Sequence, residues 1–352
     1  MNAFVPVAGH SVRAADLNDP RELIRITRFI AAAPAATPFH RPDWSRAVEQ
    51  GCGQQSHYLL AEDRAGEIAG ILPLTEMRSP LFGSALVSAG FGVDGGIVSA
   101  DPGAAELLAD HAWALAERRG CASVELRGGS APAGWDRKTG TYAGFIRDLP
   151  RTDEEILKAI PRKQRAEVRR AQGMGLEVSI GAGPDDRASH YAVYSESVRN
   201  LGTPVFPREL FASMLDNFGE DADTLTIRRN GEPVASVLNL YHRGTVYPYW
   251  GGGTAEARAL RANEIMYFEL MRHAAARGCT RFDFGRSKFG TGAYAFKKNW
   301  GFDPQPLVYS TKGEARETNP LSPKYRLQIA IWKKLPLPIA NLLGPVIARG
   351  LG

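Results

Sequence analysis

Residues 277–303, RGCTRFDFGRSKFGTGAYAFKKNWGFD, join a helix end, a short strand and a glycine-rich basic segment. Phe282 and Phe284 flank Asp283, an alternation that predicts a half-buried strand, which we expect to end at Gly285. Cations, glycines and aromatic rings then gather in one segment: Arg286, Lys288, Gly290, Gly292, Tyr294, Phe296, Lys297, Lys298 and Trp300.

This cluster suits an anionic substrate with a flat or sugar-like body. Cations hold phosphate or carboxylate, glycines let the backbone approach closely, and aromatic faces stack. We therefore expect Arg286, Lys288, Tyr294 and Phe296 to bind substrate. An alternative fits the same spacing, because Phe296 and Trp300 are four residues apart and could form the core face of a helix whose lysines meet solvent.

An earlier part of the chain repeats the pattern around this stretch. Arg119-Gly120-Cys121 matches Arg277-Gly278-Cys279, and without a gap Glu106 falls on Glu264. Each copy has a hairpin, a strand, a helix closed by glycine and a buried strand, so the sequence predicts a duplicated α/β unit. The matched cysteines open equivalent strands, and we interpret them as core residues.

A basic helix lies between the two copies, in RTDEEILKAIPRKQRAEVRRAQGMGLEVSI (residues 151–180). Lys158, Arg162, Arg165 and Arg169 are spaced by four, three and four residues, so they share one face. We expect Arg162 and Arg165 to bind an anionic substrate; the alternative is a solvated basic face.

A proline-stiffened stretch follows, SVRNLGTPVFP (residues 197–207). An irregular loop beside a cleft can position a substrate group. We expect Arg199 and Asn200 to line the acceptor side, the alternative being that Arg199 interacts with the dipole at a helix C-terminus.

Composition narrows the class of protein. The 352 residues are 44% hydrophobic and 23% charged, as in globular chains, and the net charge of +5 favours acidic partners. Three scattered cysteines and seven dispersed histidines predict neither a disulfide framework nor a metal site. We see no secretory signal and no apolar run long enough to span a bilayer, so a cytoplasmic location is expected.

The basic helix PRKQRAEVRRAQGMGLEV, the segment Phe296-Lys297-Lys298-Asn299-Trp300-Gly301 and an early FHRPDW resemble the FemAB family. The chain is most similar to FemAB-like proteins associated with the PEP-CTERM/exosortase system of exopolysaccharide-producing bacteria. The resemblance runs from about Phe39 to Tyr309 and includes the C-terminal tail.

This resemblance implies two tandem acyltransferase folds of the GNAT type, with mixed, largely antiparallel sheets. It implies transfer of an aminoacyl or acyl group to an amine or hydroxyl of a cell-envelope or exopolysaccharide precursor, without metal or tightly bound cofactor. The family places the lysine matched by Lys297 in the reaction centre, where a cation would stabilise a tetrahedral oxyanion. Asp283 is a candidate orienting residue in this centre, the alternative being a carboxylate at the edge of the core.

The donor stays open between aminoacyl-tRNA and acyl-CoA. Acetyl-CoA enzymes of this fold carry a glycine loop that cradles pyrophosphate at a helix N-terminus. Here that place is occupied by Arg258-Ala-Leu-Arg261-Ala-Asn263, without either glycine. The alternatives are an acyl-CoA-dependent N-acyltransferase of amino sugars and a non-catalytic GNAT-like scaffold for polysaccharide export.

We expect a first domain over residues 1–150, a second and catalytic domain over 151–318, and a helical tail over 319–352. From Ser322 onward the tail has basic and apolar residues and no acid. Pro336 and Pro338 divide it into helices too short to span a bilayer. The tail could attach the protein to the inner membrane, beside a lipid-linked precursor, or pack back on the first domain.

Overall fold

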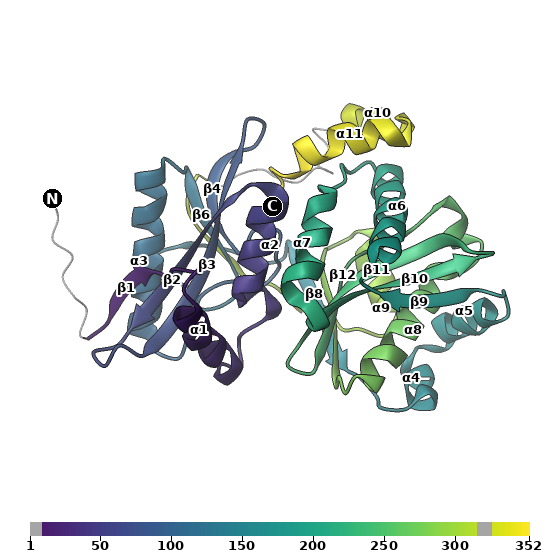
Figure 1. Cartoon of the computed structure of the whole chain (residues 1–352), viewed down its shortest axis with the longest axis horizontal. Coiled ribbons are helices and arrows are strands. Elements are labelled where there is room, and N and C mark those ends of the chain that lie inside the picture. The colour runs from purple at the N-terminus through teal and green to yellow at the C-terminus, as the bar shows by residue number, and fades with distance from the viewer. Residues whose placement is uncertain (1–8, 315–325) are drawn as a thin grey trace. The chain divides into compact units, whose positions relative to one another are not determined.

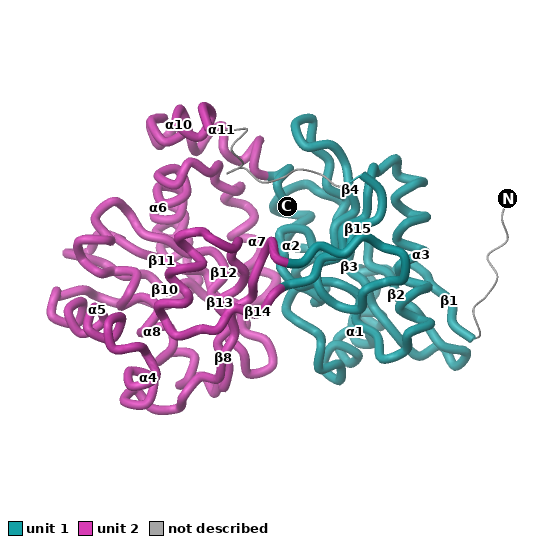
Figure 2. The backbone as a smooth tube through the Cα atoms, turned by 180° about the vertical axis from the view of Figure 1, so that it is seen from behind, with its two compact units in different colours: residues 1–139, 307–318, 349–352 teal, residues 140–306, 319–348 magenta. Residues whose placement is uncertain are grey.

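The computed structural model describes residues 9–314 and 326–352. The chain forms two compact units, coloured separately in Figure 2. Unit 1 comprises residues 1–139, 307–318 and 349–352, and unit 2 comprises residues 140–306 and 319–348. Each unit has one mixed sheet flanked by helices (Figure 1), which confirms the predicted α/β class.

Unit 1 is built on an eight-stranded sheet with the order β1-β2-β3-β4-β6-β15-β7 and β5 paired to β3. Its strands are β1 (Ser11–Ala14), β2 (Gln55–Glu62), β3 (Ile68–Ser79), β4 (Gly83–Ser88), β5 (Val98–Ser99), β6 (Ser123–Arg127), β7 (Asp136–Lys138) and β15 (Tyr309–Gly313). Its helices are α1 (Pro20–Ala32), α2 (Pro42–Cys52) and α3 (Pro102–Arg119). Successive residues of β2 point to opposite faces, so Leu60 packs with α1 and Leu59 packs with α3.

Unit 2 has a seven-stranded sheet with the order β14-β8-β13-β12-β11-β10-β9. Its strands are β8 (Tyr142–Asp148), β9 (Glu177–Gly181), β10 (Ala222–Arg229), β11 (Glu232–His242), β12 (Thr245–Gly253), β13 (Arg281–Lys288) and β14 (Gln305–Pro306). Its helices are α4 (Asp153–Ala159), α5 (Arg162–Gln172), α6 (Pro184–Leu201), α7 (Arg208–Phe218), α8 (Ala262–Ala276), α9 (Gly292–Asn299), α10 (Arg326–Lys334) and α11 (Leu337–Ala348). Leu225 and Ile227 of β10 face the core shared with α8, whereas Thr226 faces α6 through Ser236 and His190.

The two units repeat one order of elements. In unit 1 the hairpin β2–β3 is followed by the strand β4, the helix α3 and the strand β6, which pairs in parallel with β4. In unit 2 the hairpin β10–β11 is followed by β12, α8 and β13, and β13 pairs in parallel with β12. Leu86 pairs with Val124 in unit 1, and Val246 pairs with Phe282 in unit 2. This repeated topology confirms the duplication.

Cys121 and Cys279 occupy the same place in both units, directly after the glycine that follows the helix. Both thiols are buried, and burial raises the pKa of each. A thiol whose pKa is raised forms little nucleophilic thiolate, so both residues act as core packing.

One strand of each sheet comes from the other half of the chain. β8 follows β7 in sequence but pairs with β13 of unit 2, and β15 follows β14 but pairs with β6 of unit 1. The chain therefore exchanges two equivalent strands between its units (Figure 2). Each unit is therefore built from separate stretches of the chain, whereas the sequence predicted contiguous domains over residues 1–150 and 151–318.

The tail helices α10 and α11 belong to unit 2 and pack on α6. Gly202, which ends α6, lies against Ile329 of α10, and Gly344 of α11 lies against Val205. Of the two alternatives for the tail, packing back on the first domain is therefore wrong for these helices. Within the described ranges, no helix is long and apolar enough to cross a membrane.

Candidate active site

The strand β13 provides the frame of the candidate site. It pairs in parallel with β12 only at Thr245–Arg281 and Val246–Phe282, after which the two strands diverge. On its other side it pairs with β8, with a register shift between Asp283 and Arg286. A bulge of this kind re-aims side chains and is common beside active sites.

The predicted end of this strand at Gly285 is wrong, because β13 continues to Lys288. Gly285 has a φ of 68°, which glycine adopts at little cost, and this residue forms part of the bulge. Its backbone amide donates to Oδ1 of Asp283 over 2.8 Å, which fixes that carboxyl group at the bulge.

Lys297 lies above the bulge, on α9. Thr291 caps the N-terminus of this helix, and its hydroxyl accepts a hydrogen bond from the amide of Tyr294. The Nζ atom of Lys297 donates to the carbonyl of Arg286 over 2.8 Å. It also lies 5.4 Å from the ring centroid of Phe145 and 5.6 Å from that of Phe284, so two aromatic rings flank the ammonium group.

Burial shifts the titration of both groups. It lowers the pKa of Lys297 to about 7, although the charge of Asp283 acts in the opposite direction. Burial raises the pKa of Asp283 to about 6, opposed by the Gly285 amide and the Lys297 charge. A cation and a carboxyl group that both titrate near neutral pH mark a candidate reaction centre.

The other predicted residues of this segment divide into two groups. The guanidinium of Arg286 lies 4.7 Å from the ring centroid of Tyr142, and Lys288 is exposed. Tyr294 packs edge-to-face against Phe145, with 5.4 Å between the ring centroids. These three residues stay candidates for substrate contact.

Phe296 belongs to the second group. Its ring packs against Tyr267, Phe284 and Trp300, with centroids 5.7, 6.2 and 6.2 Å away. Trp300 is fully buried. The structure thus places Phe296, half-buried, against the core of unit 2, as the alternative interpretation expects. Lys297 of the same helix does not face solvent as that alternative expects, because it contacts the Arg286 carbonyl and two aromatic rings.

Arg162 and Arg165 line an open pocket of about 460 Å³ on α5, together with Ala166 and Arg169. The Nε atom of Arg165 donates to the carbonyl of Ile160, which holds its side chain in place. Three guanidinium groups on one helix face form a surface suited to phosphate or another polyanion.

The helix α8 connects this basic pocket to the rest of unit 2. Arg261, which precedes α8, pairs with Glu167 of α5 over 2.5 Å, and Tyr267 of α8 contacts Phe296 of α9. Arg261 has a φ of 54°, a left-handed conformation uncommon outside glycine, and its side chain also donates to the carbonyl of Arg258. The Arg261 side chain therefore occupies the loop in which acetyl-CoA enzymes of this fold carry glycine.

Arg199 and Asn200 lie in the last turn of α6. The guanidinium of Arg199 donates to the carbonyl of Lys333 over 3.3 Å, so it holds α10. Asn200 is exposed. Two residues earlier, Ser197 lies against Gly252 of β12, so this end of α6 reaches the part of β12 that has diverged from β13.

Sequence reasoning missed the contribution of β8. Tyr142 and Phe145 lie beside Arg286 and Lys297, yet they come from the segment assigned to the first domain. The alternation of Ala143 and Phe145, both fully buried, could have shown a strand. Nothing local to that strand identifies β13 as its partner.

The place in unit 1 that corresponds to the separation of β12 and β13 is bridged. Residues 89–97 leave β4, and Ile97 then pairs with Gly129, beyond the end of β6. The Gly96 amide donates to the Arg127 carbonyl over 2.9 Å, and a Cβ atom on Gly96 would lie 1.9 Å from the Gly128 carbonyl oxygen. The glycine-rich loop thus fills the place where the strands of unit 2 separate.

In the described part of the chain, no group of three or more histidine, cysteine, aspartate or glutamate side chains could hold a metal ion.

Residues 160–298 match the family model described as an acetyltransferase (GNAT) domain. This range lies within unit 2 and runs from the start of the arginine-rich helix to α9. No curated protein matches the chain in sequence.

Several solved structures share the fold. FemX is similar with a TM-score of 0.66 and 15% identity, over 85% of this chain and 96% of FemX. A tandem GNAT protein from the clavulanic acid biosynthesis pathway is similar with a TM-score of 0.56 and 11% identity, over 86% of this chain and 98% of that protein. The C-terminal domain of a protein described as a putative lysylphosphatidylglycerol synthetase, from Agrobacterium fabrum, is similar with a TM-score of 0.54 and 14% identity, over 83% of this chain and 92% of that domain. The chain therefore has the tandem GNAT-like fold.

Proposed function

We propose that the protein is an acyltransferase of the FemAB/GNAT type that transfers an aminoacyl or acyl group to an amine or hydroxyl. The observation that carries this proposal is Lys297, whose ammonium group lies between Phe145 and Phe284 and close to Asp283. It lies in the unit that matches a GNAT acetyltransferase domain.

The chemistry follows from this placement. An acceptor amine attacks the donor carbonyl, a C–N bond forms, and the ester or thioester bond of the donor breaks. The carbonyl oxygen carries negative charge in the tetrahedral intermediate, and a preorganised cation such as Lys297 stabilises that charge. The amine proton passes to water or to the leaving group, so the reaction needs no base from the enzyme.

The arginine face of α5 supports a donor that carries phosphate. Arg162, Arg165 and Arg169 line one pocket, and α5 is tied to the start of α8 through Glu167 and Arg261. Both aminoacyl-tRNA and acyl-CoA carry phosphates. The side chain of Arg261 in place of glycine favours aminoacyl-tRNA, because it fills the loop that would otherwise cradle pyrophosphate.

For the acceptor we propose an amine or hydroxyl of a cell-envelope or exopolysaccharide precursor, with a cytoplasmic site of reaction. The name lysylphosphatidylglycerol synthetase denotes an aminoacylated lipid and supports aminoacyl transfer by this fold. The similarity to FemX agrees with the resemblance to the FemAB family. The link to a PEP-CTERM/exosortase system rests on the sequence resemblance alone.

An acyl-CoA-dependent N-acyltransferase of amino sugars is the second candidate, because residues 160–298 match a domain named for acetyl transfer. Native mass spectrometry of the purified chain with acyl-CoA and with charged tRNA separates the two donors. A transfer assay with an amine acceptor then follows the added mass. Transfer from either donor that disappears in Lys297→Met supports the proposal. Donor binding without transfer would favour a non-catalytic scaffold instead.

A further inference from the structure

The tail helices α10 and α11 have one face packed on α6 and the segment that follows it. Ile329 lies against Gly202, and Gly344 lies against the backbone of Val205. The Asn341 amide donates to the Ser195 hydroxyl over 3.3 Å, and Arg199 donates to the carbonyl of Lys333. These contacts fix the orientation of both helices on α6.

The opposite face is apolar and exposed. Leu327 and Ile331 of α10 are 71% and 54% exposed, and Leu342 and Val346 of α11 are 74% and 66% exposed. Ile339 and Leu343 are also exposed. The two residues of α10 are four positions apart, and those of α11 lie three, four and seven positions after Ile339. These spacings put each set on one side of its helix. We call these six side chains the tail patch.

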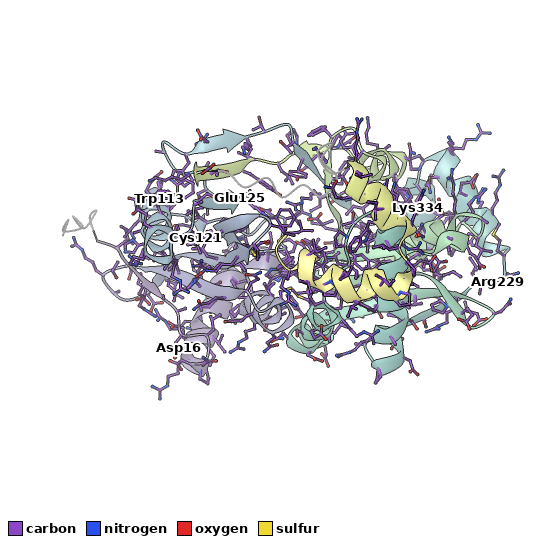
Figure 3. The ribbon with its side chains drawn as sticks, turned by 90° about the horizontal axis from the view of Figure 1, so that it is seen from above. Asp16, Trp113, Cys121, Glu125, Arg229 and Lys334 are labelled. Atoms are coloured by element: carbon purple, nitrogen blue, oxygen red, sulfur yellow. The ribbon has the colours of Figure 1, made fainter. Side chains whose placement is uncertain are left out.

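Cations accompany the tail patch. Arg326, Lys333 and Lys334 are exposed, and Lys334 at the end of α10 is labelled in Figure 3. Residues 326–348 include no aspartate or glutamate. A cluster of apolar side chains on a monomer marks an interaction surface, and its charge selects the partner.

We propose that the tail patch binds the surface of an anionic lipid bilayer. An interfacial helix inserts apolar side chains below the headgroups, while its basic residues meet lipid phosphate. A second copy of the chain fits poorly, because a symmetric contact would bring the same cations together. The helices have 9 and 12 residues, which is too short to span the bilayer.

This surface also gives the proposed acceptor a location, an extension that rests on the proposed function. The helix α6 carries the tail near Gly202 and reaches β12 at Ser197, while Glu196 accepts the amide of Ala255 over 2.8 Å. One helix thus connects the lipid-binding surface to the end of β12. We infer that the acceptor is a lipid-linked precursor rather than a freely diffusing one.

Flotation with vesicles tests the surface without any activity assay. The full chain should float with phosphatidylcholine vesicles that contain phosphatidylglycerol, float less with phosphatidylcholine alone, and lose binding as salt rises. Leu327→Glu/Leu342→Glu/Val346→Glu should abolish flotation. Lys333→Gln and Lys334→Gln should each lower the partition coefficient about fivefold.

The matched control is Ile24→Glu/Leu81→Glu, which changes two apolar residues of unit 1 that are 60% and 68% exposed. It should float like the unmodified chain. Because all five replaced side chains are exposed, circular dichroism and melting temperature should stay unchanged in both variants. Equal flotation of the tail variant, failure of the unmodified chain to float, or a dimer that the tail variant loses would each overturn the proposal.

A transfer assay with one acceptor, free or anchored in the vesicle, separates the two levels of inference. Faster transfer to the anchored acceptor, lost in the tail variant, supports the lipid-linked precursor. Flotation without any transfer would contradict the proposed function and leave the membrane surface standing. Equal transfer to both acceptors would contradict the lipid-linked acceptor alone.

Discussion

A lysine ammonium between two aromatic rings is poorly hydrated, and this explains why Lys297 titrates near neutral pH. The protein pays for that desolvation with stability. Such a group persists where its charge is used, since an ordinary core position would hold an apolar side chain.

Lys297→Met should lower kcat by about 10²–10³, because it removes one donor to the oxyanion. The neighbouring Lys298→Met is the matched control; Lys298 is exposed and should keep most activity. Thermal melting should show that both variants fold. Turnover of Lys297→Met near that of the unmodified enzyme would remove this lysine from the reaction centre.

The pKa of Lys297 also predicts the pH dependence. If the protonated lysine stabilises the oxyanion, kcat/KM should fall above about pH 7, where the charge is lost. Lys297→Arg keeps a charge that does not titrate in this range, so the falling limb should disappear. Ionisation of the acceptor amine would add a rising limb to both profiles.

The opposite pH behaviour would assign another role. In that case kcat/KM would rise to a plateau near pH 7, and Lys297→Arg would abolish activity. Together these two results would mean that the neutral amine of Lys297 accepts a proton. That outcome would contradict the proposed cation.

The arginines of α5 should act on donor binding. Arg162→Ala and Arg165→Ala should raise the donor KM roughly tenfold each with little change in kcat, because each removes a charged hydrogen-bond donor. Arg170→Ala is the control on the same helix, since Arg170 pairs with Glu167 and does not line the pocket. An equal rise in KM for all three variants would show a general charge effect.

At the scale of elements, the sequence predicted most of the architecture. The Asn230–Gly231 turn gives the β10–β11 hairpin, with φ values of 52° and 82°. The repeated glycine and cysteine at the helix ends revealed the duplication. These features are local, and local chemistry decides them.

The strand exchange could not be predicted in this way. The alternation in residues 142–148 indicates a strand, but the partner of that strand depends on which sheet edge is vacant. The same limit applies to the site, because Tyr142 and Phe145 reach Arg286 and Lys297 only through the exchange. The bulge at Gly285 also escaped prediction, since glycine ends strands as readily as it bends them.

The exchange predicts how fragments behave. A fragment of residues 140–306 keeps β8 and should melt cooperatively. A fragment of residues 151–306 loses Ala143 and Phe145, both fully buried in the core of unit 2. Loss of a buried phenylalanine alone costs about 3–5 kcal/mol, which is comparable to the whole stability of many domains.

Differential scanning calorimetry measures the difference between the two fragments. Phe145→Ala in the full chain provides an independent check and should lower the melting temperature of unit 2. Cooperative melting of both fragments at one temperature would show that β8 contributes little to unit 2.

At the scale of the whole molecule, the duplicated units have diverged. The loop over residues 89–97 bridges β4 and β6 in unit 1, whereas β12 and β13 separate in unit 2. Duplication thus supplies one unit in which these two strands separate and another in which a loop fills the equivalent place. This asymmetry supports the prediction that unit 2 performs the chemistry.

The duplication also supplies an internal control for Asp283. Glu125 follows Val124 on β6 as Asp283 follows Phe282 on β13, and both preceding residues pair with the third strand of their unit. Glu125 forms an ion pair with the buried Arg127, with 2.7 Å between the charged atoms. Figure 3 labels Glu125 together with Cys121 of the same unit. The two carboxylates therefore share a position in the fold but differ in surroundings.

Asp283→Asn should shift the falling limb of kcat/KM to lower pH. The charge of Asp283 holds the pKa of Lys297 up, so its removal lets burial lower that pKa further. Because the pKa of Asp283 is about 6, its carboxyl group is already protonated below that pH. The variant should therefore approach the unmodified enzyme near pH 5.5 and fall clearly below it near pH 7, where the unmodified enzyme still keeps part of the Lys297 charge. Glu125→Gln should lower the melting temperature because it removes the ion pair with Arg127, and it should leave the falling limb of kcat/KM in place. A loss in Asp283→Asn that is equal at every pH would show that Asp283 acts on something other than the charge of Lys297.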